Sequence, residues 1–470
     1  MENSNQVKKK SNFSSSLGFV LAAAGSAVGL GNIWRFPYLA AKGGGGLFIL
    51  IYIALALTFG FALLTTDIAI GRKTGHNPIA AYESIGKKWK FVGVLSFIIP
   101  AIILSYYSVV GGWITKYLVS YITADSASIA KDGYFTSFIT APVAPIIFMF
   151  AFLALTVIIV YFGVEKGIER FSKFVMPGLI LLILGISVFV LFSKHTDANG
   201  VTKTGFQGLA YYFVPNFDGI TVSRFFGILL DATCQLFYSL SVSMGIMITY
   251  GSYVKKETNL AKSVTQIEIF DTIVAILAGL MVVPAVYVFR DIDNMQDGAT
   301  LMFNSLPKVF DSMGAVGPFI AVAFFVMVLF AALTSSVSIM ETIVANCMQK
   351  FNVSRKKMSL IIFAIFAVAA VVVCLGYNVF YFEAILPNTP EGKNAQILDV
   401  LDYISNFLLM PIVSLFTCIL IGWIKKPSWI VEEIEQNGVV FKRKKLYSVV
   451  VRYVAPVMMS ALLLKALGLF

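Results

Sequence analysis

Ionisable side chains are scarce in this chain of 470 residues. Asp, Glu, Lys and Arg together make up 13% of the residues, whereas 58% are hydrophobic, and there are only two histidines. The apolar residues occur in repeated runs of about 20, the length that crosses the hydrocarbon of a bilayer. These runs leave no room for a sizeable soluble domain, so the composition indicates an integral membrane protein.

Cysteine is also rare, and its pattern excludes a disulfide framework or a metal site. Cys234, Cys347, Cys374 and Cys418 all lie in apolar runs, without paired spacing or clustered histidine. We therefore expect small buried residues. The sequence contains no recognisable nucleophile–base pair, metal cluster or phosphate loop, so we do not expect an enzyme.

The net charge of +11 is a topology signal and does not indicate nucleic-acid binding. Most of the 36 Lys and Arg residues fall in segments that share one side of the membrane if the N-terminus is cytoplasmic. The positive-inside rule then predicts the N-terminus inside and, with an odd number of spans, the C-terminus outside. The membrane expected is the cell inner (plasma) membrane.

Eleven segments are predicted to span the membrane. The polar start with three lysines would also suit a signal peptide, but the apolar run does not stop for a cleavage site, so we take it as the first span. We expect one transmembrane domain over 1–470, with a cytoplasmic tail at 1–11, repeats at 12–192 and 218–423, and a last helix at 443–470. The spans are 12–38, 44–70, 91–122, 141–161, 167–192, 218–254, 261–289, 316–349, 357–376, 396–423 and 446–469.

Two connections remain open to interpretation. The spans 141–161 and 167–192 are joined by a short charged turn and could be one helix. The outside connection 290–315 contains an amphipathic piece, 299–310, that is too short to span. It could cap an entrance or be a solvated loop helix.

The first span contains glycines where a membrane helix would favour Leu or Ala. Gly25, Gly29 and Gly31 each cost about 1 kcal/mol of helix propensity, and lipid offers no water to an opened backbone. Small residues at this spacing also let helices pack closely. Asn32 and Arg35 favour a break that faces a cavity, because polar groups at this depth rarely face lipid.

The sixth span carries a similar interruption, with serines and a glycine between Ser239 and Gly245. Breaks in the first and sixth helices are the pattern of two inverted repeats with a substrate site between them. We therefore predict an all-α fold of two inverted five-helix repeats, with broken first and sixth helices and one additional C-terminal helix. Asp271 and residues 334–336 add polar groups within other spans, where a helix-packing role is the alternative.

With these residues assembled, the chain resembles the neurotransmitter:sodium symporter family, especially its bacterial amino-acid transporters. The resemblance runs from about Asn12 to Trp423, and its most specific motif is the stretch from Gly25 to Tyr38. Residues 43–46, 235–245 and 333–336 support it.

The resemblance implies two sodium sites. The first would use the Ala27 carbonyl, Asn32, Ser239, Asp271 and the substrate carboxylate. The second would use the Gly25, Val28 and Ala331 carbonyls with the hydroxyls of Thr334 and Ser335. Sodium is a hard cation, and oxygen ligands of these kinds suit it.

The resemblance also places the substrate. Its carboxylate would meet backbone amides near Leu30 and Gly31, with the Tyr107 hydroxyl, and Gly29 points to an amino acid because monoamine carriers have Asp there. An apolar pocket without charge suits a neutral apolar ligand. The residues expected around the substrate are Ala27, Leu30, Gly31, Ile103, Tyr107, Tyr238, Ser239, Ser241, Met244, Ser335 and Ile339.

Two gates are implied in the same way. Arg35 and Asp402 would form the outer gate over Tyr107 and Tyr238. Lys10 would serve the cytoplasmic gate, but its usual acidic partner is replaced here by Gln349. Either another carboxylate closes that gate or it closes weakly.

We therefore expect a sodium-coupled symporter that imports a neutral, apolar L-amino acid by alternating access. The alternatives are a transport-silent receptor on the same scaffold and a proton-coupled permease. Beyond the amino acid, sodium and the lipid bilayer, no partner is expected, no nucleic acid among them, and a homodimer is left open.

Transport is expected to be independent of chloride. Chloride-dependent members resemble this chain at Tyr52, Gln235 and Ser239, but have Asn where Asp271 stands and serine where Ala275 stands. Here Asp271 would supply the negative charge that balances two sodium ions and one carboxylate. The alternative is that Asp271 is protonated or paired with another helix.

Overall fold

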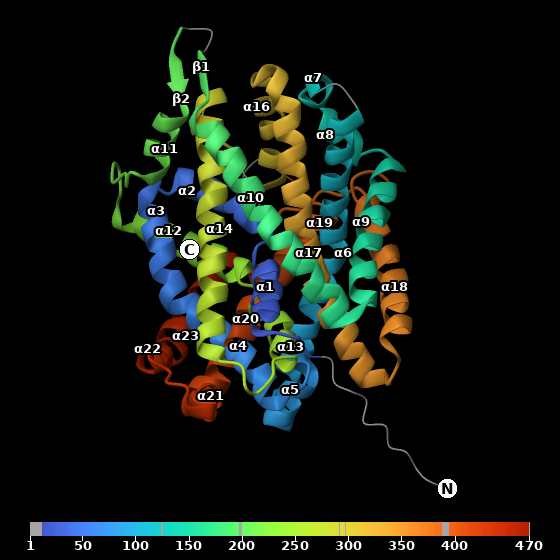
Figure 1. Cartoon of the computed structure of the whole chain (residues 1–470), viewed down its shortest axis with the longest axis vertical. Coiled ribbons are helices and arrows are strands. Elements are labelled where there is room, and N and C mark those ends of the chain that lie inside the picture. Colours follow the sequence, from blue (N-terminus) through green and yellow to red (C-terminus); the bar gives the residue numbers. More distant parts are fainter. Residues whose placement is uncertain are drawn as a thin grey trace.

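The computed structural model describes residues 12–123, 126–196, 200–290, 292–296, 298–387 and 394–469. The predicted tail at 1–11, including Lys10, lies outside these residues. Long helices run roughly along one axis, with a small hairpin at one end and α5, α21 and α22 at the other (Figure 1).

Nine helical runs in the described residues are long and apolar enough to cross a membrane. Their ends match nine of the predicted spans to within about four residues, and the fourth and fifth spans are separate helices. The runs are Gly46–Thr74 (α3, Gly46–Leu55; a π-helical segment, Ala56–Gly60; α4, Phe61–Thr74), Lys87–Thr123 (a 3-10 turn, Lys87–Trp89; α6, Lys90–Thr123), Ala144–Tyr161 (α9), Val164–Leu191 (a π-helical segment, Val164–Glu169; α10, Arg170–Leu191), Leu260–Phe289 (α14), Gly314–Phe351 (a 3-10 turn, Gly314–Val316; α17, Gly317–Phe351), Arg355–Leu375 (α18), Ile397–Ile424 (α19, Ile397–Asp402; a π-helical segment, Tyr403–Leu409; α20, Met410–Ile419; a π-helical segment, Leu420–Ile424) and Lys444–Ala466 (α22, Lys444–Val449; a π-helical segment, Val450–Val454; α23, Ala455–Ala466).

The first predicted span is a bent pair of helices. The first half is α1, Ser16–Ala27, and the second half, Gly31–Lys42, contains the π-helical segment Gly31–Arg35 and α2, Phe36–Lys42. The two halves meet at 55°, and counting them as one gives ten spans in the described residues.

The predicted sixth span, 218–254, is also interrupted. It consists of α12, Val222–Ser239, and the short α13, Ile246–Ser252, with residues 240–245 outside both helices. Neither half qualifies as a span by itself, because polar residues such as Arg224 and Asp231 lower the mean hydropathy of α12 and because α13 has only seven residues. The structure therefore shows nine to ten apolar spans, and the eleventh depends on counting α12 and α13 together.

Two short strands correct the all-α prediction. The connection 193–216, between the fifth and sixth spans, contains β1, Lys194–Thr196, and β2, Thr202–Thr204, in an antiparallel hairpin. Lys194 pairs with Thr204, His195 with Lys203 and Thr196 with Thr202. Three-residue strands carry too little alternation of apolar and polar residues to be predicted from sequence. The fold is therefore mostly helical.

Short helices cover both ends of the bundle. The predicted amphipathic piece at 299–310 is helical. Lys308 of this piece donates a hydrogen bond to Asp132, and this bond joins the helix to the neighbouring loop. The same bond lowers the pKa of the Asp132 carboxyl. The short elements at the hairpin end are α7 (Ser126–Ile129), α8 (Tyr134–Ile139), α11 (Gly205–Phe213), a 3-10 turn (Ile292–Asn294), α15 (Gly298–Thr300), a π-helical segment (Leu301–Ser305) and α16 (Leu306–Ser312); those at the other end are α5 (Pro78–Ile85), α21 (Ser428–Ile434) and a 3-10 turn (Gln436–Gly438).

Close backbone contact joins α4 to α13. A Cβ added at Gly71 would lie 1.9 Å from the Ile248 carbonyl oxygen, and one added at Gly251 would lie 2.3 Å from the Ile68 carbonyl oxygen. No side chain fits at either glycine, so α13, the second half of the broken sixth helix, is packed directly against the second span.

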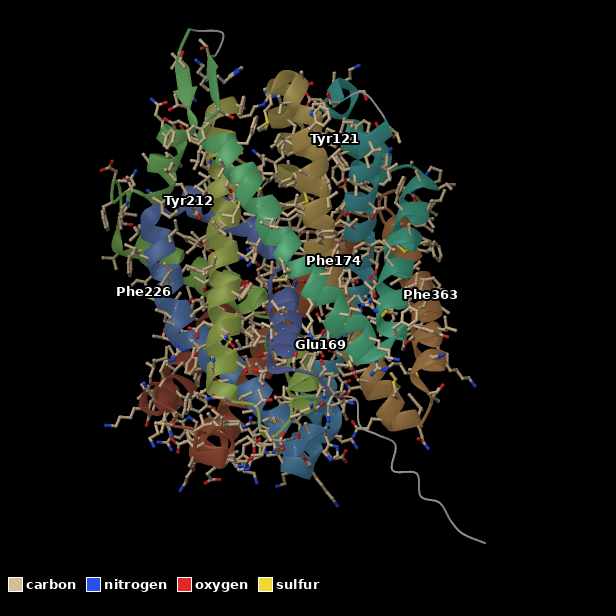
Figure 2. All side chains as sticks on the ribbon, in the orientation of Figure 1. Tyr121, Glu169, Phe174, Tyr212, Phe226 and Phe363 are labelled. Carbon is tan, nitrogen blue, oxygen red and sulfur yellow. The ribbon has the colours of Figure 1, made fainter. Side chains whose placement is uncertain are left out.

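Large apolar side chains also cover the outside of the bundle. Phe226 and Phe363 lie on opposite flanks in Figure 2, and Phe226 is 56% exposed while Phe174 is 75% exposed. Exposed apolar residues along membrane-length helices are the surface that lipid tails cover. Buried polar residues at the two helix breaks include Ser26, Asn32, Ser239, Ser241 and Ser243.

Candidate functional site

The first helix break leaves backbone groups free beside buried side chains. After Ala27 the chain leaves the helix, with Val28 in an extended conformation (φ −72°, ψ 93°). The N–H of Gly29 donates no hydrogen bond to any described residue, whereas its carbonyl accepts from the N–H of Asn32 at 3.2 Å. Exposed amides at the start of a helix favour an anionic group, as the prediction for a substrate carboxylate requires.

The second break contains strained serines. Ser241 and Ser243 have left-handed φ angles of 53° and 65°, and Gly245 has 74°. This conformation costs a residue with a Cβ about 1 kcal/mol or more. The Ser241 hydroxyl donates to the Ser26 carbonyl at 3.0 Å, so the two breaks contact each other.

Three residues predicted for the first sodium site hydrogen-bond to one another. The Ser239 hydroxyl donates to Asn32 Oδ1 at 3.0 Å and to Asp271 Oδ1 at 2.5 Å, and Asn32 Nδ2 donates to Asp271 Oδ1 at 2.8 Å. Tyr52 donates to Asp271 Oδ2 at 3.4 Å. Asn32 and Asp271 are fully buried and Ser239 is 3% exposed. Hard oxygens from three elements thus converge at one place, which suits a sodium ion as cargo.

The residues predicted for the second sodium site lie where α1 faces α17. A Cβ added at Gly25 would lie 3.3 Å from Thr334 Cβ, and the Ser335 hydroxyl donates to the Ser26 carbonyl at 3.1 Å. Val28 and Ala331 are fully buried. The Thr334 hydroxyl donates to the Ala331 carbonyl at 2.9 Å, so carbonyl and hydroxyl oxygens are close together here too.

Only some of the residues predicted for the substrate pocket contact one another directly. A Cβ added at Gly29 would lie 2.9 Å from Ser335 Oγ and 3.8 Å from the Tyr107 hydroxyl, so these three residues are adjacent. The hydroxyls of Tyr107 and Tyr238 are buried and bond to no described residue. Buried hydroxyls in proteins usually have a partner, so both are suited to bind a ligand.

The rest of the predicted pocket is apolar and buried. Met244 is 6% exposed, Ile103 is 5% exposed and Ile339 is 4% exposed. On the other side of the break, Gln235 donates to the Gly31 carbonyl at 3.0 Å, and Ala27 and Leu30 are buried. No charged residue belongs to this set.

The predicted outer gate does not form an ion pair in the described structure. The Arg35 guanidinium lies 4.6 Å above the Tyr238 ring and donates to Cys234 Sγ at 3.4 Å. Asp402 instead accepts from Tyr106 at 3.0 Å and from Asn406 at 2.5 Å. Arg35 and Asn406 both line a cavity of about 310 Å³, and the guanidinium lies 5.8 Å from the centre of the Phe407 ring, which belongs to the same helical run as Asp402.

Near the end of the bundle that carries α5 and α21 lies a buried carboxylate that the sequence reasoning did not name. Glu341 of α17 is fully buried and accepts from the Tyr253 hydroxyl at 2.7 Å and from Arg355 Nη2 at 2.9 Å. Gln349, the residue at the usual acidic position, bonds to Asn77 at 3.0 Å. Lys10 lies outside the described residues, so whether Glu341 takes the place of the missing acidic partner stays a prediction.

A second contact ties the start of α1 to the end of the π-helical segment that precedes α10. Glu169 accepts from the Ser14 backbone N–H at 2.7 Å, from the Ser15 hydroxyl at 3.1 Å and from Lys173 at 2.7 Å. Figure 2 shows Glu169 beside the lower end of α1. A Cβ added at Gly18 would lie 2.0 Å from Glu169 Oε1, so the carboxylate occupies the space that glycine leaves.

A model of the sodium:neurotransmitter symporter family matches residues 10–130 and 137–469. The chain belongs to this family. The resemblance inferred from the residue motifs is therefore confirmed. The family is one of transporters, in agreement with the expectation that the chain is no enzyme.

Individual members of this family are similar to this chain over most of their length. The uncharacterized sodium-dependent transporter YhdH of Bacillus subtilis is 35% identical, over 87% of this chain and 88% of its own. An uncharacterized sodium-dependent transporter of Haemophilus influenzae is 33% identical, over 89% and 90%. The crystal structure of MhsT in complex with L-phenylalanine is 34% identical, covers 97% of this chain and 100% of MhsT, and superposes with a TM-score of 0.81.

These comparisons show a sodium-dependent symporter in a family of multi-pass membrane transporters. Within this symporter, the sequence reasoning missed Glu341, Glu169 and Ser26. Glu341 carried a usable signal, because a lone carboxylate in an apolar span is a functional candidate by default. Ser26 carried none, since its carbonyl and its hydroxyl both bond to residues more than 200 positions away.

Proposed function

We propose that this symporter imports a neutral, apolar L-amino acid together with sodium by alternating access. The observation that carries the proposal is the group formed by Gly29, Ser335 and Tyr107, where a free backbone N–H and an unpaired hydroxyl lie beside an apolar, uncharged pocket. An amide and hydroxyls suit a carboxylate, and the pocket suits an apolar side chain. The solved complex of MhsT with L-phenylalanine supports the same ligand class.

Two sodium ions are proposed to travel with each substrate. The first would bind at Asn32, Ser239 and Asp271 with the Ala27 carbonyl, and the second at Thr334 and Ser335 with the carbonyls of α1 and Ala331. Each sodium ion that enters down a 100 mV potential contributes about 2.3 kcal/mol of driving force. The oxygen-rich contacts described above support both positions.

The proposed scaffold has eleven spans in two inverted five-helix repeats and a last helix, with α12 and α13 counted as the sixth span. The N-terminus would be cytoplasmic and the C-terminus outside, in the cell membrane. The two helix breaks, which contact each other through Ser241 and the Ser26 carbonyl, support a site between the repeats.

Sodium-driven uptake into liposomes tests the transport proposal. Leucine, methionine and the aromatic amino acids are expected to compete for uptake, whereas lysine and glutamate are not, because the pocket has no charge to pair with theirs. Competition by glutamate at a similar concentration would contradict the proposed pocket. Binding without uptake would favour a receptor.

Chloride is proposed to be unnecessary, because Asp271 supplies a fixed negative charge. Within the described residues Asp271 accepts hydrogen bonds only from neutral donors and makes no ion pair, so no neighbouring cation cancels its charge. Ala275, one turn along α14, is fully buried and offers no donor to an anion.

Replacing chloride with gluconate at constant sodium is expected to leave uptake unchanged. Asp271→Asn combined with Ala275→Ser is expected to make uptake rise with chloride, because the fixed charge is lost and a hydroxyl donor is gained. A large loss of uptake in gluconate by the unmutated protein would refute the proposal.

A further inference from the structure

A second buried carboxylate of α14 lies close to the first sodium site. Glu268 is 1% exposed and lies three residues before Asp271, so the two carboxylates share one face of the helix. A carboxylate in an apolar span is a functional candidate by default, and neither proposed sodium site uses Glu268. Its burial requires a partner that balances the charge.

That partner is Arg443, which immediately precedes α22 at the start of the last span. Its Nη2 donates to Glu268 Oε2 at 3.0 Å and its Nη1 donates to Glu268 Oε1 at 3.3 Å. Nη2 also donates at 2.8 Å to the hydroxyl of Thr265, one turn before Glu268 on α14. A guanidinium that bonds to both oxygens of a carboxylate fixes its geometry as well as balancing its charge. Arg443 therefore holds α14 at two successive turns.

The same guanidinium also contacts the second span. It lies 3.6 Å from the centre of the Phe61 ring, and its Nη1 donates to the Leu57 carbonyl at 3.2 Å. A cation above an aromatic ring is attracted by the negative face of the ring. A single side chain thus joins the last span to both the second and the seventh.

Both of these spans reach the first sodium site. Asp271 follows Glu268 by one turn of α14, about 4.5 Å along the helix axis. Tyr52 lies five residues before Leu57 in the second span and donates to Asp271 Oδ2 at 3.4 Å. The contacts of Arg443 and the bond from Tyr52 to Asp271 therefore connect the same two helices at neighbouring levels. A change in the spacing of these helices at Arg443 would move the Asp271 carboxylate.

We propose that Arg443 is a positioning residue for the first sodium site. By holding Glu268 against the second span, it keeps the Asp271 carboxylate in the position that sodium requires. The inference rests on the proposed first sodium site. None of the described residues to which Arg443 bonds is a proposed ligand of sodium or substrate, so its effect reaches the ion through α14.

The test replaces both members of the buried pair with apolar residues. Removing only one member would leave an unpaired buried charge, whereas apolar side chains of similar volume in both places often keep a protein as stable as before. Glu268→Leu combined with Arg443→Met also leaves the net charge unchanged. A change in sodium binding by this variant therefore reports lost positioning, because charge and folding are preserved.

Sodium binding is measured on purified protein as the rise in melting temperature with sodium at constant ionic strength. Thr334→Ala and Ser335→Ala are present in every sample, so that only the first site responds. Each sample is measured with and without leucine, because the substrate carboxylate is a predicted ligand of this site. The apolar pair is expected to need about tenfold more sodium for half of the rise, the size typical when the support behind a metal ligand is lost.

The matched control replaces another buried pair, further from the sodium site. Arg72 of α4 and Glu433 of α21 pair at 2.8 Å, with side chains 2% and 0% exposed. Arg72 lies about 30 Å along the second span from Tyr52. Glu433→Leu combined with Arg72→Met is therefore expected to leave the sodium midpoint unchanged.

An equal sodium midpoint with and without the apolar pair, or an equal shift in the control, would overturn the inference. If the apolar pair yields no folded protein, the comparison is made with Arg443→Lys, which keeps the charge but loses the paired bonds to the carboxylate. A raised midpoint then supports the inference, and an equal one refutes it. No response to sodium in any sample would instead refute the proposed sodium site itself. Because the measurement does not depend on transport, a raised midpoint supports the inference even if no apolar amino acid is imported.

Discussion

Tyr253→Phe tests whether Glu341 closes the inner end. The change removes one hydrogen bond, of 2.7 Å, from the Tyr253 hydroxyl to Glu341 Oε1. It leaves the ring, which packs edge-on against Phe13 at 6.2 Å between centroids. Arg355 still pairs with the carboxylate, so no buried charge is left alone.

The magnitude follows from the kind of bond that is lost. A hydrogen bond to a charged group contributes about 1.5–3 kcal/mol, which is a factor of about 10 to 100 in an equilibrium. The bond joins the end of α13 to α17, so it must break when the inner end opens. The fraction of molecules open to the cytoplasm is therefore expected to rise about tenfold or more.

A cysteine introduced at a buried position of α17 can measure this opening by its rate of reaction with a thiol reagent. Ala345 lies one turn beyond Glu341 on the same face of α17 and is 4% exposed. Ala345→Cys is expected to react with a thiol reagent about tenfold faster when combined with Tyr253→Phe. Tyr212→Phe is the matched control, because it removes a partly buried hydrogen bond of 2.9 Å to the Ile276 carbonyl, between α11 and α14. Equal reaction rates with and without Tyr253→Phe would refute the role of Glu341.

Two further predictions concern sodium and the start of the first helix. Thr334→Ala combined with Ser335→Ala is expected to abolish sodium-driven accumulation in liposomes while the protein stays folded, because two oxygen ligands are lost; unchanged uptake would remove the second sodium site. Gly18→Ala is expected to lower the melting temperature, because the added methyl would lie 2.0 Å from Glu169 Oε1. Gly185→Ala is the control, since nothing lies within 4 Å of its added Cβ, and an equal effect of both changes would contradict the packing at Gly18.

The membrane spans could be predicted from the sequence because hydropathy is a local property. The helix break at Gly29 could also be predicted from the sequence, because the glycines, Asn32 and Arg35 that indicate it all lie within one short stretch. The sixth helix was harder to define. The polar residues of α12, such as Arg224 and Asp231, lower its hydropathy, and the break at 240–245 divides what remains.

Partners of buried charges could not be predicted in the same way. A carboxylate in an apolar span is visible in the sequence, and the rule that selected Asp271 applies equally to Glu341 and Asp67. Their partners lie 88 positions away for Glu341 and Tyr253, and 176 for Asp67 and Ser243. Which carboxylate faces a cation, an amide or a hydroxyl is therefore decided by helix packing.

The π-helical segment Ala56–Gly60 affects how the second span tolerates a change of length. A π-helical turn holds one residue more than an α-helical turn, and each residue turns an α-helix by about 100°. Deleting one residue within Ala56–Gly60 would restore a plain α-helix and keep the two halves of the span facing their present neighbours. Deleting one residue within Phe61–Thr74 would rotate part of α4 away from α13. The bulge is thus the one place in this span where the chain can be shortened without turning either half of the helix.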